Sequence, residues 1–130
     1  MRIRLHAVLG GLVLCAHSPV STVAGEEKDS VPDFTRDVLP IFEAKCLRCH
    51  GAKKRAGKLD MRTLDALRKG GVTSPAIQPG NARKSLLIEL LHYNEMPPKK
   101  ETPRVTKEEL ELLRKWINAM PVPSATSPNR

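Results

Sequence analysis

The chain has 130 residues, which allows one domain at most, and its formal net charge is +8 at pH 7. A basic balance often indicates nucleic-acid binding. Here, however, the lysines and arginines are spread along the chain, and aromatic side chains that stack on bases make up only 3% of the residues. The composition therefore argues against nucleic-acid binding and favours a partner protein with an acidic surface.

The first 24 residues have the pattern of a secretory signal peptide, with two arginines near the start, a short apolar run and small residues ending at Ala24. The run is too short to predict a membrane-spanning helix, so we expect no stable membrane insertion of the mature chain. Lipid anchoring through Cys15 is the weaker alternative, because Leu14 stands where a small residue is normally found. We therefore expect export to the periplasm or secretion.

A helix is predicted directly before the two closely spaced cysteines. After a polar linker at residues 25–31, Asp33 can cap a helix that runs to Cys46. The apolar face of this helix carries Phe34, Val38, Ile41 and Phe42. Pro40 interrupts the pattern. Either the helix kinks there, or a separate turn over residues 33–39 precedes a helix that starts near the proline.

The next five residues, Cys-Leu-Arg-Cys-His at positions 46–50, have the spacing that covalent haem attachment requires. Cys46 and Cys49 can each form a thioether bond with a vinyl group of a haem, and His50 can ligate the iron as the proximal axial ligand. A redox dithiol would open a helix after a strand, whereas this motif follows a predicted helix. A structural zinc site would need a second pair of ligands, and the only other cysteine is Cys15. We therefore expect one covalently bound haem c.

Short helices alternate with loops in the middle of the chain. Thr63 is predicted to cap a short helix that ends at Gly70-Gly71. A second helix starts at Asn81 or Ser85 and is apolar on more than one side, so we expect it to pack against something large. A loop with three prolines follows over residues 93–103.

The last predicted helix has the clearest signals. Thr106 and Glu109, three residues apart, form a capping box at its start, and Pro121 ends it. Its apolar stripe consists of Leu110, Leu113, Trp116, Ile117 and Met120. Residues 121–130 are predicted to be a disordered tail. Because the sequence has no repeat and no strand pattern, we predict an all-α domain over residues 32–120.

Met96 is the predicted sixth ligand of the iron. It lies in a loop after a helix and is followed by two prolines, which hold a loop rigid without hydrogen bonds, so that a weak thioether ligand can stay on the iron. The alternative is that Met96 fills a gap in the core, as methionines often do. His92 is the rival ligand, although a half-exposed histidine at a helix end is the more ordinary interpretation. Met61 and Met120 lie in regions that do not suit a distal ligand.

Several segments over residues 34–120 form a pattern together with the cysteine motif. They are Gly51, Met96-Pro97-Pro98, Asp37-Val38-Leu39-Pro40-Ile41, Gly57-Lys58-Leu59-Asp60, Pro79-Gly80 before Ser85-Leu86-Leu87, and Trp116-Ile117. With these segments the chain resembles the small class I cytochromes c and, among them, the planctomycete-type cytochrome c family. The resemblance implies three to five helices around one covalent haem, with crossing N- and C-terminal helices, which suits a contact of Phe34 or Phe42 with Trp116. In that family the domain is often one part of a much larger secreted protein.

The function predicted from these features is that of an exported monohaem c-type cytochrome, which carries single electrons between redox partners and is not an enzyme. The compact segment is short for a self-sufficient core, and a buried haem would supply apolar volume. Ligands that do not exchange suit electron transfer better than substrate chemistry. The alternative is a haem enzyme or gas sensor, with Met96 off the iron and an open distal site. A thiol or zinc protein without haem is a third hypothesis.

Six basic side chains are close in sequence to the two predicted axial ligands. They are Arg48, Lys53, Lys54, Arg55, Lys99 and Lys100. Chain connectivity keeps them near the iron, so they could form a positive ring that steers an acidic redox partner toward the haem edge. The alternative is a solvated basic surface, because runs of charge usually are solvated faces.

Overall fold

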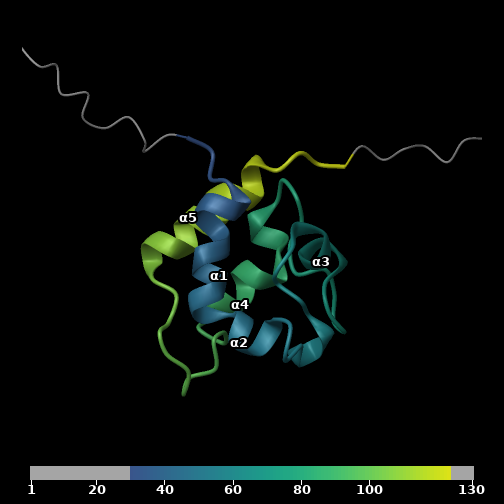
Figure 1. Cartoon of the computed structure of the whole chain (residues 1–130). Helices are drawn as coiled ribbons and strands as arrows, with labels where there is room; N and C mark the ends of the chain where they lie inside the picture. The colour runs from purple at the N-terminus through teal and green to yellow at the C-terminus, as the bar shows by residue number, and fades with distance from the viewer. Residues whose placement is uncertain (1–29, 124–130) are drawn as a thin grey trace, which may run out of the picture.

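The structure, a computed structural model, describes residues 30–123 (Figure 1). This part of the chain consists of helices and loops, with no strand in it beyond an isolated pairing of His50 with Arg55. The predicted all-α fold is confirmed for these residues. None of the helices in this range has the length and apolar character needed to span a bilayer. The predicted signal peptide at residues 1–24 and the last part of the predicted tail, residues 124–130, lie outside the described residues.

The segment before the cysteine motif forms two helices in succession. A π-helical turn, η1 (Phe34–Val38), is capped by Asp33, whose carboxylate accepts two backbone N–H groups at 2.8 Å each. The helix α1 (Leu39–Lys45) follows directly, with Pro40 in its first turn, where the missing N–H group would have no helical partner in any case. Of the two alternatives that Pro40 left open, the separate turn followed by a new helix is the one observed.

The cysteine motif is itself helical. Cys46 separates α1 from a single turn, α2 (Leu47–His50), which holds the remaining residues of the motif. Gly51 is buried directly after this turn, and a Cβ atom there would collide with the carbonyl oxygen of Leu47. Glycine therefore lets the chain turn away closely after His50.

One regular helix lies between the motif and the central loop. α3 (Leu64–Lys69) begins after Thr63, whose hydroxyl accepts the N–H group of Ala66 at 3.2 Å, and it ends at Gly70, which has a φ of 75°. This helix was predicted with both of its ends. A short 3₁₀ turn, η2 (Ala56–Lys58), lies within the predicted basic loop before it.

Both of the predicted starting points for the next helix have a role. Asn81 caps a 3₁₀ turn, η3 (Ala82–Lys84), through its side chain. α4 (Leu86–His92) then begins after Ser85, whose hydroxyl does not cap the helix. That hydroxyl instead accepts the N–H group of Gln78 at 2.8 Å and donates to the carbonyl of Asn81 at 3.0 Å. Ser85 thus ties the preceding loop to the start of α4.

α5 (Lys107–Ala119) is the longest of the described helices. The hydroxyl of Thr106 accepts the N–H group of Glu109 at 3.2 Å, and the carboxylate of Glu109 accepts the N–H group of Thr106 at 2.7 Å. This reciprocal pair is the predicted capping box. The predicted stripe faces the core: Leu113, Trp116, Ile117 and Met120 are buried, and Leu110 is partly buried against them.

The first and last helical segments pack against each other, and α1 lies beside α5 (Figure 1). The ring of Trp116 stacks on Phe34 with centroids 5.7 Å apart and meets Phe42 edge-on at 6.3 Å. Aromatic contacts of this kind contribute about 0.5–1.5 kcal/mol each beyond the burial of their area. The expected contact of Phe34 or Phe42 with Trp116 is therefore confirmed for both phenylalanines.

The first and last described residues lie at the same end of the molecule, and α2 lies at the opposite end (Figure 1). The backbone N–H group of Gly80 donates to the carbonyl of Ile117 at 2.9 Å, and the side-chain oxygen of Asn118 accepts the N–H group of Ala82 at 2.8 Å. These bonds fix η3 against the end of α5. The cysteine motif thus lies at the end of the fold opposite residues 30 and 123.

Candidate haem site

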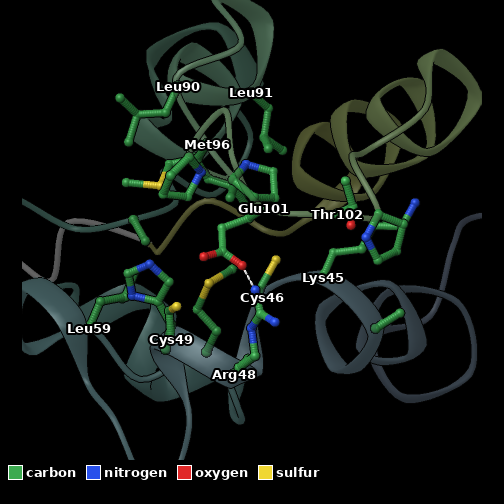
Figure 2. A pocket seen from close by; sticks show the side chains of 18 of the residues that line it. Lys45, Cys46, Arg48, Cys49, Leu59, Leu90, Leu91, Met96, Glu101 and Thr102 are labelled. Carbon is green, nitrogen blue, oxygen red and sulfur yellow. Dashed lines mark ion pairs between the residues drawn. The ribbon is translucent and has the colours of Figure 1, made fainter.

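A pocket opens between α2, α4 and the loop that follows α4 (Figure 2). The space inside it, counted out to its open mouth, is about 940 Å³. Most of its wall is apolar and is formed by Leu59, Met61, Ala76, Leu86, Leu87, Leu90, Leu91, Met96, Pro97 and Pro98. Cys46, Cys49 and His50 line the same pocket. The fold therefore brings the four predicted site residues together.

Cys46 and Cys49 are free thiols that are half-buried in the pocket wall. Burial raises the pKa of the Cys46 thiol to about 12, and the neighbouring positive charge of Lys45 lowers it by less. This thiol is therefore protonated at neutral pH, whereas thioredoxin-like chemistry depends on a lowered thiol pKa. Within residues 30–123, no group of three or more histidine, cysteine, aspartate or glutamate side chains is arranged to hold a metal ion.

His50 ends α2 with its ring half-buried in the pocket wall. Burial lowers the pKa of the imidazole, the backbone groups of Ala56 and Leu59 raise it by less, and the positive charge of Lys54 lowers it. The ring is consequently held in its neutral form, which is the form that ligates metals. Its Nδ1 atom is buried and makes no hydrogen bond in the described part of the chain. An imidazole nitrogen in this pocket is thus left without a protein partner.

Met96 lies on the wall opposite the two cysteines (Figure 2). The backbone N–H groups of Glu95 and Met96 both donate to the carbonyl of Leu90, at 2.8 and 3.2 Å, and so turn the chain back over the end of α4. His92, the rival candidate for the sixth ligand, is exposed at the end of α4 and does not line the pocket. Of these two candidates, only Met96 is in a position to reach a group bound between the walls.

Met61, which was not predicted to be a ligand, is a second thioether in the pocket wall. Its side chain is 2% exposed, and its backbone N–H group donates to the carbonyl of His50 at 2.8 Å. Met61 is therefore held next to the residue that carries the predicted proximal ligand. Because the two axial ligands of a haem iron approach it from opposite faces, Met61 is less well placed than Met96 to be the second ligand. The alternation of Leu59 and Met61 around a polar residue was the available signal for a buried side chain here. Met120 is buried in the core and is not part of the pocket.

One known family matches the part of the chain that contains most of these pocket residues. Residues 46–100 match the model of the family described as Planctomycete cytochrome C. This segment has the sequence of a planctomycete-type cytochrome c domain. The matched segment includes Cys46, Cys49, His50 and Met96, while η1, α1 and α5 lie outside it. Searches among curated proteins and solved structures returned no match.

The cytochrome domain has donor atoms and a lining that fit the haem c that this family implies. Two thiols stand at attachment spacing, a neutral imidazole has an unused nitrogen, and a thioether lies on the far wall among leucine side chains. One feature does not suit a large apolar group: the ion pair of Arg48 with Glu101, which crosses the pocket between the two walls (Figure 2). Arg48 is 70% exposed at its side chain, so this pair can move aside into water.

Two of the six basic side chains around the cytochrome site form ion pairs with carboxylates. Arg48 pairs with Glu101, and Arg55 pairs with Asp60 at 3.2 Å. The other four are exposed: Lys53, Lys54, Lys99 and Lys100. The positive charge near the pocket therefore comes mainly from two lysine pairs, one after the cysteine motif and one after Met96.

Proposed function

We propose that this cytochrome domain carries single electrons between redox proteins, with one haem c held by Cys46, Cys49, His50 and Met96. The observation that supports this most is an apolar pocket that has the cysteine motif on one side and Met96 on the other (Figure 2). A bound haem supplies one-electron redox chemistry at its iron.

Different residues would hold different parts of the haem. Cys46 and Cys49 attach it through thioether bonds, so that it cannot dissociate. His50 and Met96 would ligate the iron of a bound haem, and this would leave no open position for a substrate or a gas. The leucines of α4 limit the access of water to the pocket. These roles favour an electron carrier over the alternative, a haem enzyme or gas sensor.

The axial ligands are tested on the haem-loaded protein by absorption spectroscopy and potentiometry. We expect a six-coordinate, low-spin spectrum with the far-red charge-transfer band of methionine bound to ferric iron. A soft thioether favours ferrous iron, so Met96→His should remove this band and lower the midpoint potential. His92→Ala and Met61→Leu are the controls for the ligand and should leave the band in place.

Three other outcomes would contradict parts of the proposal. Loss of the band in His92→Ala or Met61→Leu, with retention in Met96→Ala, would move the sixth ligand to that residue. A five-coordinate, high-spin spectrum of the unaltered protein would favour the enzyme or gas-sensor hypothesis. A haem that is extracted by acidified organic solvent, with no added haem mass on the protein, would contradict attachment through Cys46 and Cys49.

We also propose that the protein is exported to the periplasm or secreted, on the basis of the sequence of residues 1–24. Covalent attachment of haem c takes place outside the bacterial cytoplasm, so export and haem binding belong together. Expression with a c-haem maturation system and mass measurement of the periplasmic product should give a chain that begins at Gly25. A product that retains Met1 would contradict cleavage at this site.

The partner that we propose is an acidic redox protein. The exposed pairs Lys53–Lys54 and Lys99–Lys100 flank the segments that carry His50 and Met96, so an acidic surface would be drawn toward the pocket mouth. Steering of this kind is screened by salt over about 8 Å at physiological ionic strength. The association rate should therefore depend on ionic strength.

A further inference from the structure

We propose that Arg104 is a positioning residue, which clamps the Met96 loop in place over the pocket. This inference rests on the proposed role of Met96 as an axial ligand. The guanidinium group of Arg104 donates to three residues that bracket Met96 in sequence: Asn94, Pro97 and Pro98. It does not bind Met96 itself, and it acts through the backbone on both sides of it.

The guanidinium group uses all three of its nitrogen atoms on this loop. Nε donates to the side-chain oxygen of Asn94 at 2.9 Å, and Nη2 donates to the same oxygen and to the Asn94 carbonyl, the latter at 3.1 Å. Nη1 donates to the carbonyls of Pro97 and Pro98, at 2.7 and 3.2 Å. A rigid planar fork with five donors is suited to such a convergent set of acceptors, which a single ammonium group could not all reach.

The loop needs an external donor because of its own sequence. Pro97 and Pro98 have no N–H groups, so the turn cannot be closed by hydrogen bonds from these positions. Asn94 has a φ of 60°, in the left-handed region that asparagine tolerates better than most residues. Its side-chain oxygen accepts from Arg104, so the same contact that binds the loop also fixes this turn. Arg104 thus adds hydrogen bonds from outside to a loop in which two prolines supply no backbone donor.

Arg104 is itself anchored to the side of the fold that carries the cysteines. Its carbonyl oxygen accepts a hydrogen bond at 2.8 Å from Nζ of Lys45, the residue next to Cys46. The same ammonium group pairs with Glu109 in the capping box of α5. The ligand loop, the start of α5 and the end of α1 are therefore joined through Arg104 and Lys45. Movement of the Met96 loop away from the pocket would have to break the Arg104 end of this network.

The test measures how quickly Met96 can leave the iron in the haem-loaded protein. Imidazole is added as the competing ligand, and loss of the charge-transfer band is followed by stopped-flow absorbance. We expect Arg104→Ala to accelerate this loss at least about tenfold. This is the effect on the rate if the closed loop loses the stabilisation of one charge-assisted hydrogen bond. Arg104→Lys keeps the positive charge without the planar guanidinium group, so its rate of band loss should lie between those of the unaltered protein and Arg104→Ala. Arg83→Ala, at an exposed arginine on η3, is the control and should react as the unaltered protein does.

A second measurement reads the loop without reference to the iron. Amide hydrogen exchange at Glu95 and Met96, whose N–H groups donate to the Leu90 carbonyl, should increase in Arg104→Ala and not in Arg83→Ala. If Arg104 only stabilised the whole fold, Arg104→Ala would increase exchange along α5 as much as at Glu95 and Met96. That result would overturn the clamp. If Arg104→Ala does not fold, Arg104→Lys provides the same two readouts.

The two proposals can fail separately. If the unaltered protein shows no methionine–iron band, the proposed ligation by Met96 is wrong, and the exchange measurement still decides whether Arg104 holds the loop. If the band is present but neither displacement nor local exchange changes in the Arg104 variants, the clamp is wrong and the ligation stands.

Discussion

The ion pair between Lys45 and Glu109 gives the most quantitative test of the structure, because it joins the residue before the first haem cysteine to the last helix. The Lys45 side chain is 8% exposed and that of Glu109 is 26% exposed. Exposed ion pairs contribute about 0.2–1 kcal/mol, whereas removing one partner of a fully buried pair costs about 3–5 kcal/mol. This pair lies between the two limits. Its energy should also lie between them.

Lys45→Met keeps most of the buried stem and removes the ammonium group. We expect it to lower the free energy of unfolding by about 2 kcal/mol, which combines the broken pair with the lost hydrogen bond to the Arg104 carbonyl. Glu109→Gln should cost less, about 1 kcal/mol, because an amide oxygen can still accept the N–H group of Thr106. The interaction energy of the double-mutant cycle should be about 1 kcal/mol.

The assay is urea unfolding of the haem-loaded protein, followed by far-UV circular dichroism, for the unaltered protein, both single variants and the double variant. The control cycle uses Asp65 and Arg68 on α3, whose side chains are 95% and 38% exposed and whose charged atoms are 3.7 Å apart. That pair should give an interaction energy below about 0.5 kcal/mol. If the Lys45–Glu109 cycle gave no more than this control, the buried bridge between α1 and α5 would not exist in solution.

Three further predictions concern the core, the pH dependence and the charges around the pocket. Phe42→Ala should lower the free energy of unfolding by about 3–5 kcal/mol in the same urea assay, since Phe42 is fully buried against Trp116. A hydrogen bond from Arg62 lowers the pKa of Asp60 to about 2 from 3.8, so this carboxylate stabilises the fold above pH 4 and loses that effect as the pH falls from about 4 through about 2. Asp60→Asn should accordingly flatten the loss of stability over this range in acid titrations. Electron transfer to hexacyanoferrate(III), an anionic acceptor, should slow as salt is added, and it should slow further in a variant with glutamate in place of the three lysines Lys53, Lys54 and Lys99.

Each of these predictions has a result that would contradict it. Val72→Ala, at a side chain that is 66% exposed, should change stability by less than about 0.5 kcal/mol, and a loss in Phe42→Ala no larger than this would remove Phe42 from the core. Equal acid sensitivity of Asp60→Asn and the unaltered protein would show that other carboxylates set the pH dependence. A transfer rate that responds neither to salt nor to charge reversal would leave the lysines as a solvated surface.

Features that depend on neighbouring residues could be predicted from the sequence. The capping box of Thr106 and Glu109 and the helix between Thr63 and Gly70 follow from side chains a few positions apart, because they satisfy backbone groups of the same turn. The haem motif at residues 46–50 is equally local. The pairing of the first and last helices, in contrast, was expected only from the resemblance to class I cytochromes c.

Features that depend on the packing of distant segments could not be predicted in this way. Met61 reaches the pocket because its backbone is bonded to His50, eleven positions earlier, and Glu101 reaches Arg48 across the pocket. Arg104 has no sequence signal at all, since its acceptors are backbone carbonyls that a folded loop brings together. The choice between a kink and a separate turn at Pro40 also required the fold, because both alternatives satisfy the proline.

The placement of the two ends of the described chain has a consequence for how this domain can be built into larger assemblies. Both ends lie at one pole, and the single turn with the haem motif lies at the other (Figure 1). A neighbouring domain or a surface tether joined at either end would therefore stand behind the cytochrome and leave its pocket facing outward. For the proposed electron carrier, attachment beyond residue 30 or beyond residue 123 would thus leave the pocket accessible to a partner protein.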